Sequence, residues 1–190
     1  MNGLTTKVSL YDLLSMIIPG YLFLYLLKRA FFSEYSQTCD ESTYLIVVFS
    51  CSYIIGLAIH YIAKLIFKSL RNNKCIITRT REKFYNLNNV SIESKKDILS
   101  EYMDSYYIAS KYNWSSIPVL EAQYSFLRSM ILVELAYLLL GCKASLSICQ
   151  MSIIALVLII TLILMIKILY DTSYRVWEDS FFCKRLNADE

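Results

Sequence analysis

Charged residues are scarce in this chain of 190 residues. Asp, Glu, Lys and Arg make up 18% of it, whereas a water-soluble domain carries roughly 25%. Four glycines and two prolines are too few for a loop-rich β protein. The single histidine, His60, and six cysteines without a C-x-x-C pair exclude a structural zinc site and a thiol redox motif. These absences argue against a disordered linker and against a compact soluble enzyme.

Catalytic signatures are missing as well. No P-loop, G-x-S-x-G or H-E-x-x-H pattern occurs, and nothing resembles the paired-aspartate signature of membrane alcohol phosphotransferases. We therefore expect no enzymatic activity, no cofactor and no bound metal. The chain is instead 56% hydrophobic, with a mean hydropathy of +0.45, which is typical of a membrane protein.

Two long apolar runs predict membrane-spanning helices. Residues 42–63 and 144–166 extend over 22 and 23 positions without an Asp, Glu, Lys or Arg. A helix rises about 1.5 Å per residue, so about 20 residues cross a hydrocarbon core of about 30 Å. Both runs are long enough to cross a bilayer.

Two further segments predict spans with polar interruptions. The first is broken by Pro19 and Gly20, so it is either a kinked span or a helix lying in the interface. The other carries Arg128 and Glu134, which a span tolerates when they face protein or water. We predict an all-α, four-span transmembrane helix bundle, with spans at about 9–32, 43–66, 124–142 and 146–168.

Basic residues are distributed unevenly between the predicted loops. With the amino terminus inside, sixteen of the nineteen Lys and Arg residues are cytoplasmic, and only Lys28, Arg29 and Lys143 lie outside. This pattern predicts a multi-pass protein of the bacterial inner membrane with both termini in the cytoplasm. Cys39 and Cys142, both outside, are either free thiols or a disulfide. The predicted parts are a first hairpin at 1–67, a cytoplasmic basic and amphipathic helical segment at 68–123, a second hairpin at 124–170 and a tail helix at 171–190.

Helical periodicity continues in the cytoplasmic parts. Apolar residues recur every three or four positions over 91–112, which predicts an amphipathic helix. Pro118 suits the first turn of the next helix, which we expect to run unbroken into the third span. Tyr170, Tyr174 and Trp177 share a stripe that continues the fourth span. We therefore expect helices that protrude into the cytoplasm, and a homo-oligomer.

Glu134 is the strongest single candidate for function. It lies near the midplane of its span, where a charge costs about 3 kcal/mol or more. Its candidate partners are Arg128, His60 and Lys64, and Asp12 is a further pore or gating candidate. The alternatives are a static ion pair, a pore-lining or gating carboxylate, and a proton-coupling site.

Small residues mark a face for close helix packing. Ser52, Gly56 and His60 lie four apart on the second span, a spacing that lets two helices approach closely, within one chain or between subunits. Pro19 and Gly20 are the corresponding packing candidates on the first span.

A basic run precedes the amphipathic helix. Its simplest role is to set topology and to attract anionic lipid headgroups. The alternative is an anionic nucleotide or oligonucleotide, with basic side chains on its phosphates and aromatic rings stacked on its bases. The candidate residues for this site are Arg71, Lys74, Arg79, Arg81, Lys83, Tyr102, Tyr106 and Trp114.

The amino-terminal segment resembles the start of small multi-spanning bacterial proteins, some of them encoded in phage-defence loci. It reads Leu10-Tyr11-Asp12-Leu13-Leu14, followed by Ile18-Pro19-Gly20-Tyr21. The overall layout is similar to that of small membrane effectors such as the oligonucleotide-controlled channel of Hailong-type defence. The resemblance covers about the first 25 residues and the layout, and no ligand-binding residue carries over. It implies an effector that acts by permeating the membrane.

These features together predict a homo-oligomeric, ligand-controlled ion channel that serves antiviral defence. Its signal would be an anionic nucleotide or oligonucleotide on the cytoplasmic side. One alternative is a membrane binding module, an immunity protein or assembly subunit that forms no pore. Another is a small proton-coupled transporter, which the lack of an internal repeat disfavours. The expected partners are the lipid bilayer, other copies of the chain, the nucleotide signal and an operon-encoded protein.

Overall fold

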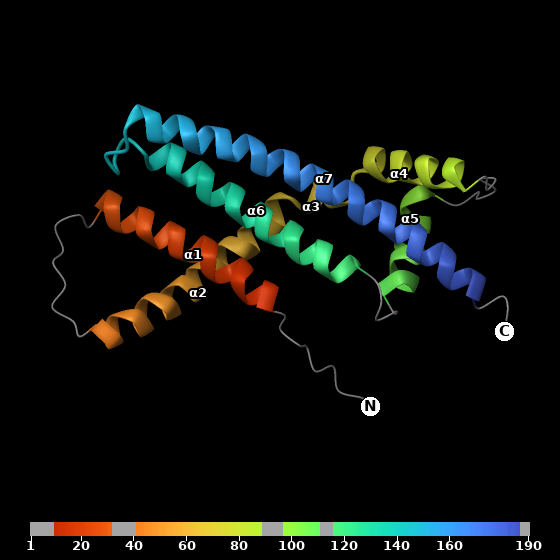
Figure 1. Ribbon diagram of the computed structural model, residues 1–190, viewed down its shortest axis with the longest axis horizontal. Helices are drawn as coiled ribbons and strands as arrows, with labels where there is room; N and C mark the ends of the chain where they lie inside the picture. Colours follow the sequence, from red (N-terminus) through yellow and green to blue (C-terminus); the bar gives the residue numbers. More distant parts are fainter. Residues whose placement is uncertain (1–9, 32–40, 89–96, 111–115, 187–190) are drawn as a thin grey trace. The chain divides into compact units, whose positions relative to one another are not determined.

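The computed structural model describes residues 10–31, 41–88, 97–110 and 116–186, and within these it is helical without a strand (Figure 1). The predicted all-α class is confirmed. The helices are α1 (Leu10–Phe31), α2 (Glu41–Ile66), α3 (Lys68–Arg71), α4 (Lys74–Leu87), α5 (Ile98–Ser110), α6 (Ile117–Leu140) and α7 (Ile148–Leu186).

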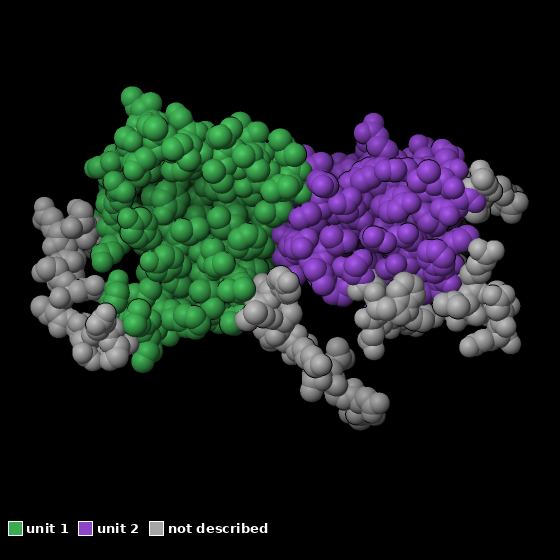
Figure 2. All heavy atoms as spheres, viewed as in Figure 1, with its two compact units in different colours: residues 1–66, 125–164 green, residues 67–124, 165–190 purple. Residues whose placement is uncertain are grey.

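The chain divides into two compact units (Figure 2). Unit 1 comprises residues 1–66 and 125–164, and unit 2 comprises residues 67–124 and 165–190. Helices α6 and α7 contribute residues to both units, because each continues past a unit boundary.

Four helices are long and apolar enough to cross a membrane, as the sequence predicts. The qualifying stretches are Leu13–Phe31, Tyr44–Ile66, Ile117–Leu140 and Ile148–Cys183. Helix α1 runs uninterrupted through Pro19. Helix α6 carries Pro118 in its first turn, where a missing N–H costs nothing, and continues to Leu140 as predicted. Helix α7 extends the fourth span without a break as far as Leu186.

Within unit 1, α1 and α2 cross near their middles (Figure 1). At the crossing a Cβ atom on Gly20 would overlap the carbonyl oxygen of Ser52, and one on Gly56 would overlap the carbonyl oxygen of Met16. Only glycine permits two backbones to approach this closely. The small-residue face of α2 therefore packs within the chain, against α1.

The outer surface of unit 1 is apolar. Ile46 and Ile54 of α2 are 67% and 64% exposed, and Leu156 and Ile163 of α7 are 59% and 61% exposed. Polar backbone groups in these helices are satisfied internally, as a hydrocarbon solvent requires. Such a surface suits contact with lipid.

The turn between α6 and α7 has ordinary capping chemistry. The Leu146 amide donates to the Gly141 carbonyl at 2.9 Å, and Ser145 has a positive φ of 54°. At the start of α7 the Ser147 amide donates to the Gln150 side chain at 3.0 Å, and the Gln150 amide donates to the Ser147 hydroxyl at 3.3 Å. This reciprocal pair is a capping box.

Unit 2 has an aromatic core. Phe84 of α4 meets the rings of Tyr85, Tyr174 and Phe181 edge-on at centroid distances of 5.6 to 5.9 Å. Such edge-to-face pairs add to the stabilisation that burial provides. The fully buried members of this core are Ile77, Phe84, Tyr102, Ala109, Ile117, Val176 and Trp177.

Within the described residues, the amphipathic helix predicted over 91–112 corresponds to α5, from Ile98 to Ser110. Helix α5 begins at Ile98, and the carbonyl of Asp97 accepts from the Glu101 amide at 3.1 Å. Asp97 therefore precedes the helix. The prediction for 91–96 and for 111–112 falls outside the described residues.

Candidate functional site

Glu134 lies buried in unit 1, and its partner comes from α7. The Thr161 hydroxyl lies 2.9 Å from Glu134 Oε1, and it is also 2.9 Å from the Val157 carbonyl. Glu134 is 6% exposed, and its Oε2 has no hydrogen-bond partner among the described residues. A buried polar atom without a donor costs about 1–3 kcal/mol. The carboxyl group is thus half satisfied inside an apolar bundle.

Arg128 belongs to a second polar cluster in unit 1. Its Nη2 lies 3.1 Å from His60 Nε2 of α2 and 2.8 Å from the Ser125 hydroxyl. An arginine can only donate, so His60 Nε2 accepts and Nδ1 carries the proton. That Nδ1 lies 3.4 Å from the Ser125 hydroxyl. The cluster joins α6 to α2.

The two polar clusters lie on different faces of α6. Arg128 and Glu134 are six residues apart, which turns the helix by about 600°, so they do not share a face. Arg128 meets α2, whereas Glu134 meets α7. The partners predicted for Glu134 included Arg128 and His60, which instead contact one another, while Lys64 is exposed. Asp12 lies in α1, and its side chain is outside the described residues.

In unit 2, Arg71 contacts an acidic residue of the same chain. Its Nη2 lies 2.5 Å from Glu121 Oε1, and Tyr106 donates its hydroxyl to the same oxygen at 2.9 Å. The Arg71 guanidinium also lies 5.4 Å from the centre of the Tyr106 ring. Burial, together with the negative charge of Glu121, raises the pKa of Tyr106 to about 12.

Two more of the predicted basic residues form ion pairs. Arg81 Nη2 lies 2.6 Å from Glu101 Oε2, with both side chains at most 14% exposed. Such a pair is screened by water far less than a surface one. Lys74 Nζ lies 3.3 Å from Asp97 Oδ1, and both of these side chains are exposed. The cations Arg71, Lys74 and Arg81 therefore meet carboxylates within unit 2.

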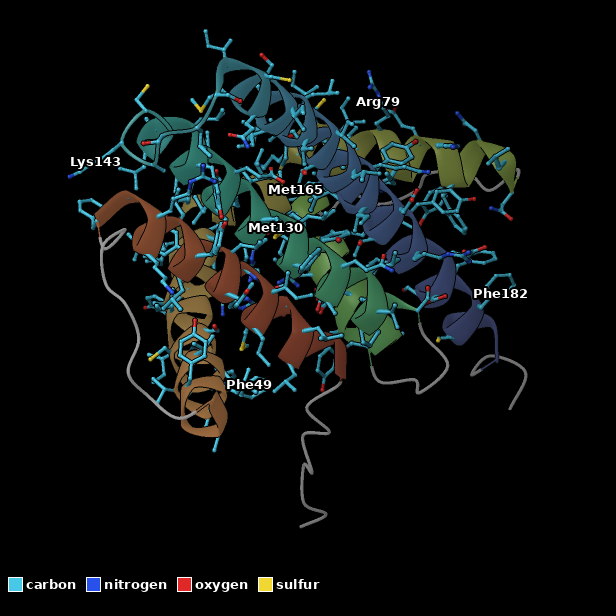
Figure 3. The ribbon with its side chains drawn as sticks, turned by 60° about the vertical axis from the view of Figure 1, so that its left-hand side comes forward. Phe49, Arg79, Met130, Lys143, Met165 and Phe182 are labelled. Atoms are coloured by element: carbon cyan, nitrogen blue, oxygen red, sulfur yellow. The ribbon has the colours of Figure 1, made fainter. Side chains whose placement is uncertain are left out.

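Lys83 is placed differently from the other basic residues. Its ammonium group lies 5.4 Å from the centre of the Tyr170 ring and 5.7 Å from that of Tyr174. It lines a hollow of about 620 Å³ formed by α4, α6 and α7 within unit 2. Arg175 lines the same hollow and lies 2.5 Å from Glu178. Arg79, one turn before Lys83, is exposed and projects from α4 (Figure 3).

The predicted aromatic ligands divide between core and surface. Tyr102 is buried in the unit 2 core, with its ring 5.7 Å from that of Trp177, so it is not available to stack on a base. Burial raises the pKa of Tyr102. Tyr106 is half-buried beside Arg71. Trp114 lies outside the described residues.

Several site residues were not anticipated by the sequence analysis. The carboxylates Glu101 and Glu121 neutralise basic residues, and Thr161 donates to Glu134. The sequence does contain features that predict α4 and its buried face. Asn73 precedes it and caps the Cys75 amide at 2.9 Å, and Ile77, Thr80 and Phe84 recur at helical spacing. The part of the basic run from Lys74 to Lys83 thus lies on one amphipathic helix with a buried face, while Arg71 belongs to α3.

No group of three His, Cys, Asp or Glu residues comes together as a metal site within the described ranges. Cys142 is a free thiol, and Cys39 lies outside those ranges. Comparisons with protein-family models, with curated proteins and with solved structures gave no match.

Proposed function

We propose that the chain is the subunit of a homo-oligomeric, ion-conducting effector of the bacterial inner membrane, opened by an anionic nucleotide or oligonucleotide at unit 2. The observation that carries the proposal is Glu134, a carboxyl group buried among apolar helices with one oxygen unpartnered. The resemblance of the amino-terminal segment to phage-defence effectors supports the same activity.

A half-satisfied carboxyl group favours a state in which water reaches it. A charge at mid-membrane costs about 3 kcal/mol or more, and hydration recovers most of that cost. Polar residues on two faces of α6, Arg128 and Glu134, make this helix the best candidate to line a wet path. Parting α7 from α6 would free Glu134 from Thr161 and open that path.

Helix α7 supplies the coupling in this proposal. It carries Thr161 in unit 1 and Tyr170 and Tyr174 in unit 2, on one uninterrupted helix. An anionic ligand entering the hollow would place phosphate near Lys83 and a base against the tyrosine rings. This assigns the ligand to Lys83 rather than to Arg71, Lys74 and Arg81, because those three cations already meet carboxylates.

Ion flux through proteoliposomes tests the proposal. We expect flux in the presence of a cytosolic nucleotide extract, and at least a tenfold loss in Glu134→Gln, which keeps the acceptor for Thr161 but removes the charge. Glu82→Gln is the matched control, since Glu82 is an exposed carboxylate of α4. Flux that is absent under every condition, or equal in Glu134→Gln and Glu82→Gln, would refute the proposal.

A membrane binding module without a pore is the second candidate. It is favoured by the carboxylates that neutralise Arg71, Lys74 and Arg81, because these pairs weaken the predicted nucleotide site. The two candidates differ in assembly. A closed ring of identical subunits in detergent supports a channel, whereas a monomer supports the binding module.

A further inference from the structure

A cavity of about 360 Å³ opens between α1 and α2 in unit 1, at the end of the hairpin where α1 finishes. Its walls are Tyr21, Tyr25, Lys28 and Arg29 of α1 with Tyr44 and Val48 of α2. Lys28 lies 5.8 Å from the centre of the Tyr44 ring. The volume is within the range of ligand sites, which begins at about 300 Å³.

The lining changes character along α1. Tyr21, Leu24 and Val48 form the end nearer the middle of the helices, and Lys28 and Arg29 form the outer end. Seven residues separate Tyr21 from Lys28, which corresponds to about 10 Å of helix. Along α1 the lining is therefore aromatic and apolar toward the middle of the helix and doubly cationic toward its end, and none of the described lining residues is acidic.

The basic residues at this end of the cavity lie on the side of the membrane where the sequence predicts few basic residues. Only three basic residues are predicted to lie outside, and two of them, Lys28 and Arg29, line the cavity. The third, Lys143, lies 3.8 Å from the centre of the Phe31 ring, at the end of the same helix. Under the positive-inside rule, Lys and Arg are enriched in cytoplasmic loops and are scarce in the loops on this side. Cations that remain together there point to an anionic ligand.

We propose that this cavity binds one phospholipid with an anionic headgroup. Lys28 and Arg29 hold the phosphate, the tyrosine hydroxyls donate to headgroup and ester oxygens, and the upper acyl chain lies against Leu24 and Val48. Lipid fits better than a soluble anion because the polarity changes along the helix as it does along a lipid molecule. The proposal does not depend on whether the chain conducts ions.

Lipid titration followed by native mass spectrometry tests this site on the full chain in detergent. Phosphatidylglycerol should bind more tightly than phosphatidylcholine. Lys28→Gln with Arg29→Gln should weaken phosphatidylglycerol binding about twenty-five-fold, because each cation near anionic lipid contributes about fivefold. The control is Lys68→Gln with Lys167→Gln, which removes the same charge from exposed positions outside the cavity and should change binding less than twofold.

A second variant separates the cavity from its charge. Val48→Trp fills the hollow and keeps both cations, and it should weaken phosphatidylglycerol binding at least tenfold. Equal losses in the two charge-removing pairs would reduce the effect to net charge and overturn the proposal, as would unchanged binding in Val48→Trp. Displacement of the lipid by millimolar inorganic phosphate would show that the site takes a soluble anion, and would overturn it too.

Discussion

The two units differ in the surface that they expose, and α7 shows the change within one helix. In unit 1 this helix exposes Leu156 and Ile163, whereas in unit 2 it buries Val176 and Trp177 completely or nearly so. Of the 35 charged residues of the chain, 24 lie in the residues of unit 2. The difference is the one expected of a helix that passes from lipid into water, because lipid accepts apolar side chains and water does not.

The units also use different means of packing. Unit 1 joins α1 to α2 through backbone contact at Gly20 and Gly56, the kind of packing typical of helices in lipid, where hydrophobic burial provides no driving force. Unit 2 joins its helices through rings such as Phe84 and through the largely buried pair of Arg81 and Glu101. We therefore expect different substitutions to destabilise the two units: added side-chain bulk at the glycines of unit 1, and loss of aromatic side chains in unit 2.

The largest effect is expected in the aromatic core. Phe84→Ala removes a side chain that is 2% exposed, so the free energy of unfolding of unit 2 should fall by about 3–5 kcal/mol. Urea unfolding followed by tryptophan fluorescence measures this. Phe182→Ala is the control, because Phe182 is 48% exposed and projects from α7 (Figure 3). An equal fall in the free energy of unfolding in the two variants would contradict the position of Phe84 in the core of unit 2.

The close helix crossing should give the next largest effect. Gly56→Leu forces a side chain into the backbone of α1 at Met16, and overpacking of this kind costs about 1–3 kcal/mol. The melting temperature in detergent should fall by several degrees. Ala58→Leu places the same side chain on an exposed part of α2 and should leave the melting temperature unchanged. A tolerant Gly56 would show that α1 and α2 do not cross here.

Sequence periodicity predicts the spans and the continuity of α6 and α7, because length and apolarity are properties of each segment alone. It does not predict that Thr161 meets Glu134, 27 residues away on another helix. The rotation of one helix against another depends on packing across the bundle. For the same reason the basic run is visible in the sequence, while the carboxylates of Glu101 and Glu121 that neutralise it are not.

A smaller effect is expected at Thr161. Thr161→Val removes the hydroxyl that donates to Glu134, so the stability of unit 1 should fall by about 1–3 kcal/mol. Thr161→Ser keeps the hydroxyl and should retain most of the stability. Thermal unfolding of the two variants in the same detergent gives the comparison. Identical behaviour would show that this hydrogen bond does not hold α6 to α7.

The smallest effect is a pH dependence confined to unit 2. Burial and Glu121 raise the pKa of Tyr106 to about 12 in the folded state, from about 10 in an unfolded chain. The folded state thus holds this proton more tightly, and its contribution is complete below pH 10 and is lost as pH rises from about 10 to 12. Urea midpoints across this range should fall less steeply in Tyr106→Phe. Tyr107→Phe, at a 62% exposed neighbour, should keep the original slope.

Thiol labelling along α7 tests the two-solvent account most directly. Leu156 and Phe182 are similarly exposed by the protein itself, at 59% and 48%. Each is replaced by cysteine in a chain whose six native cysteines are all changed to alanine. In open membrane fragments a water-soluble maleimide should label Phe182→Cys and not Leu156→Cys, and denaturing detergent should make both reactive. Equal labelling of the two positions before denaturation would contradict the account.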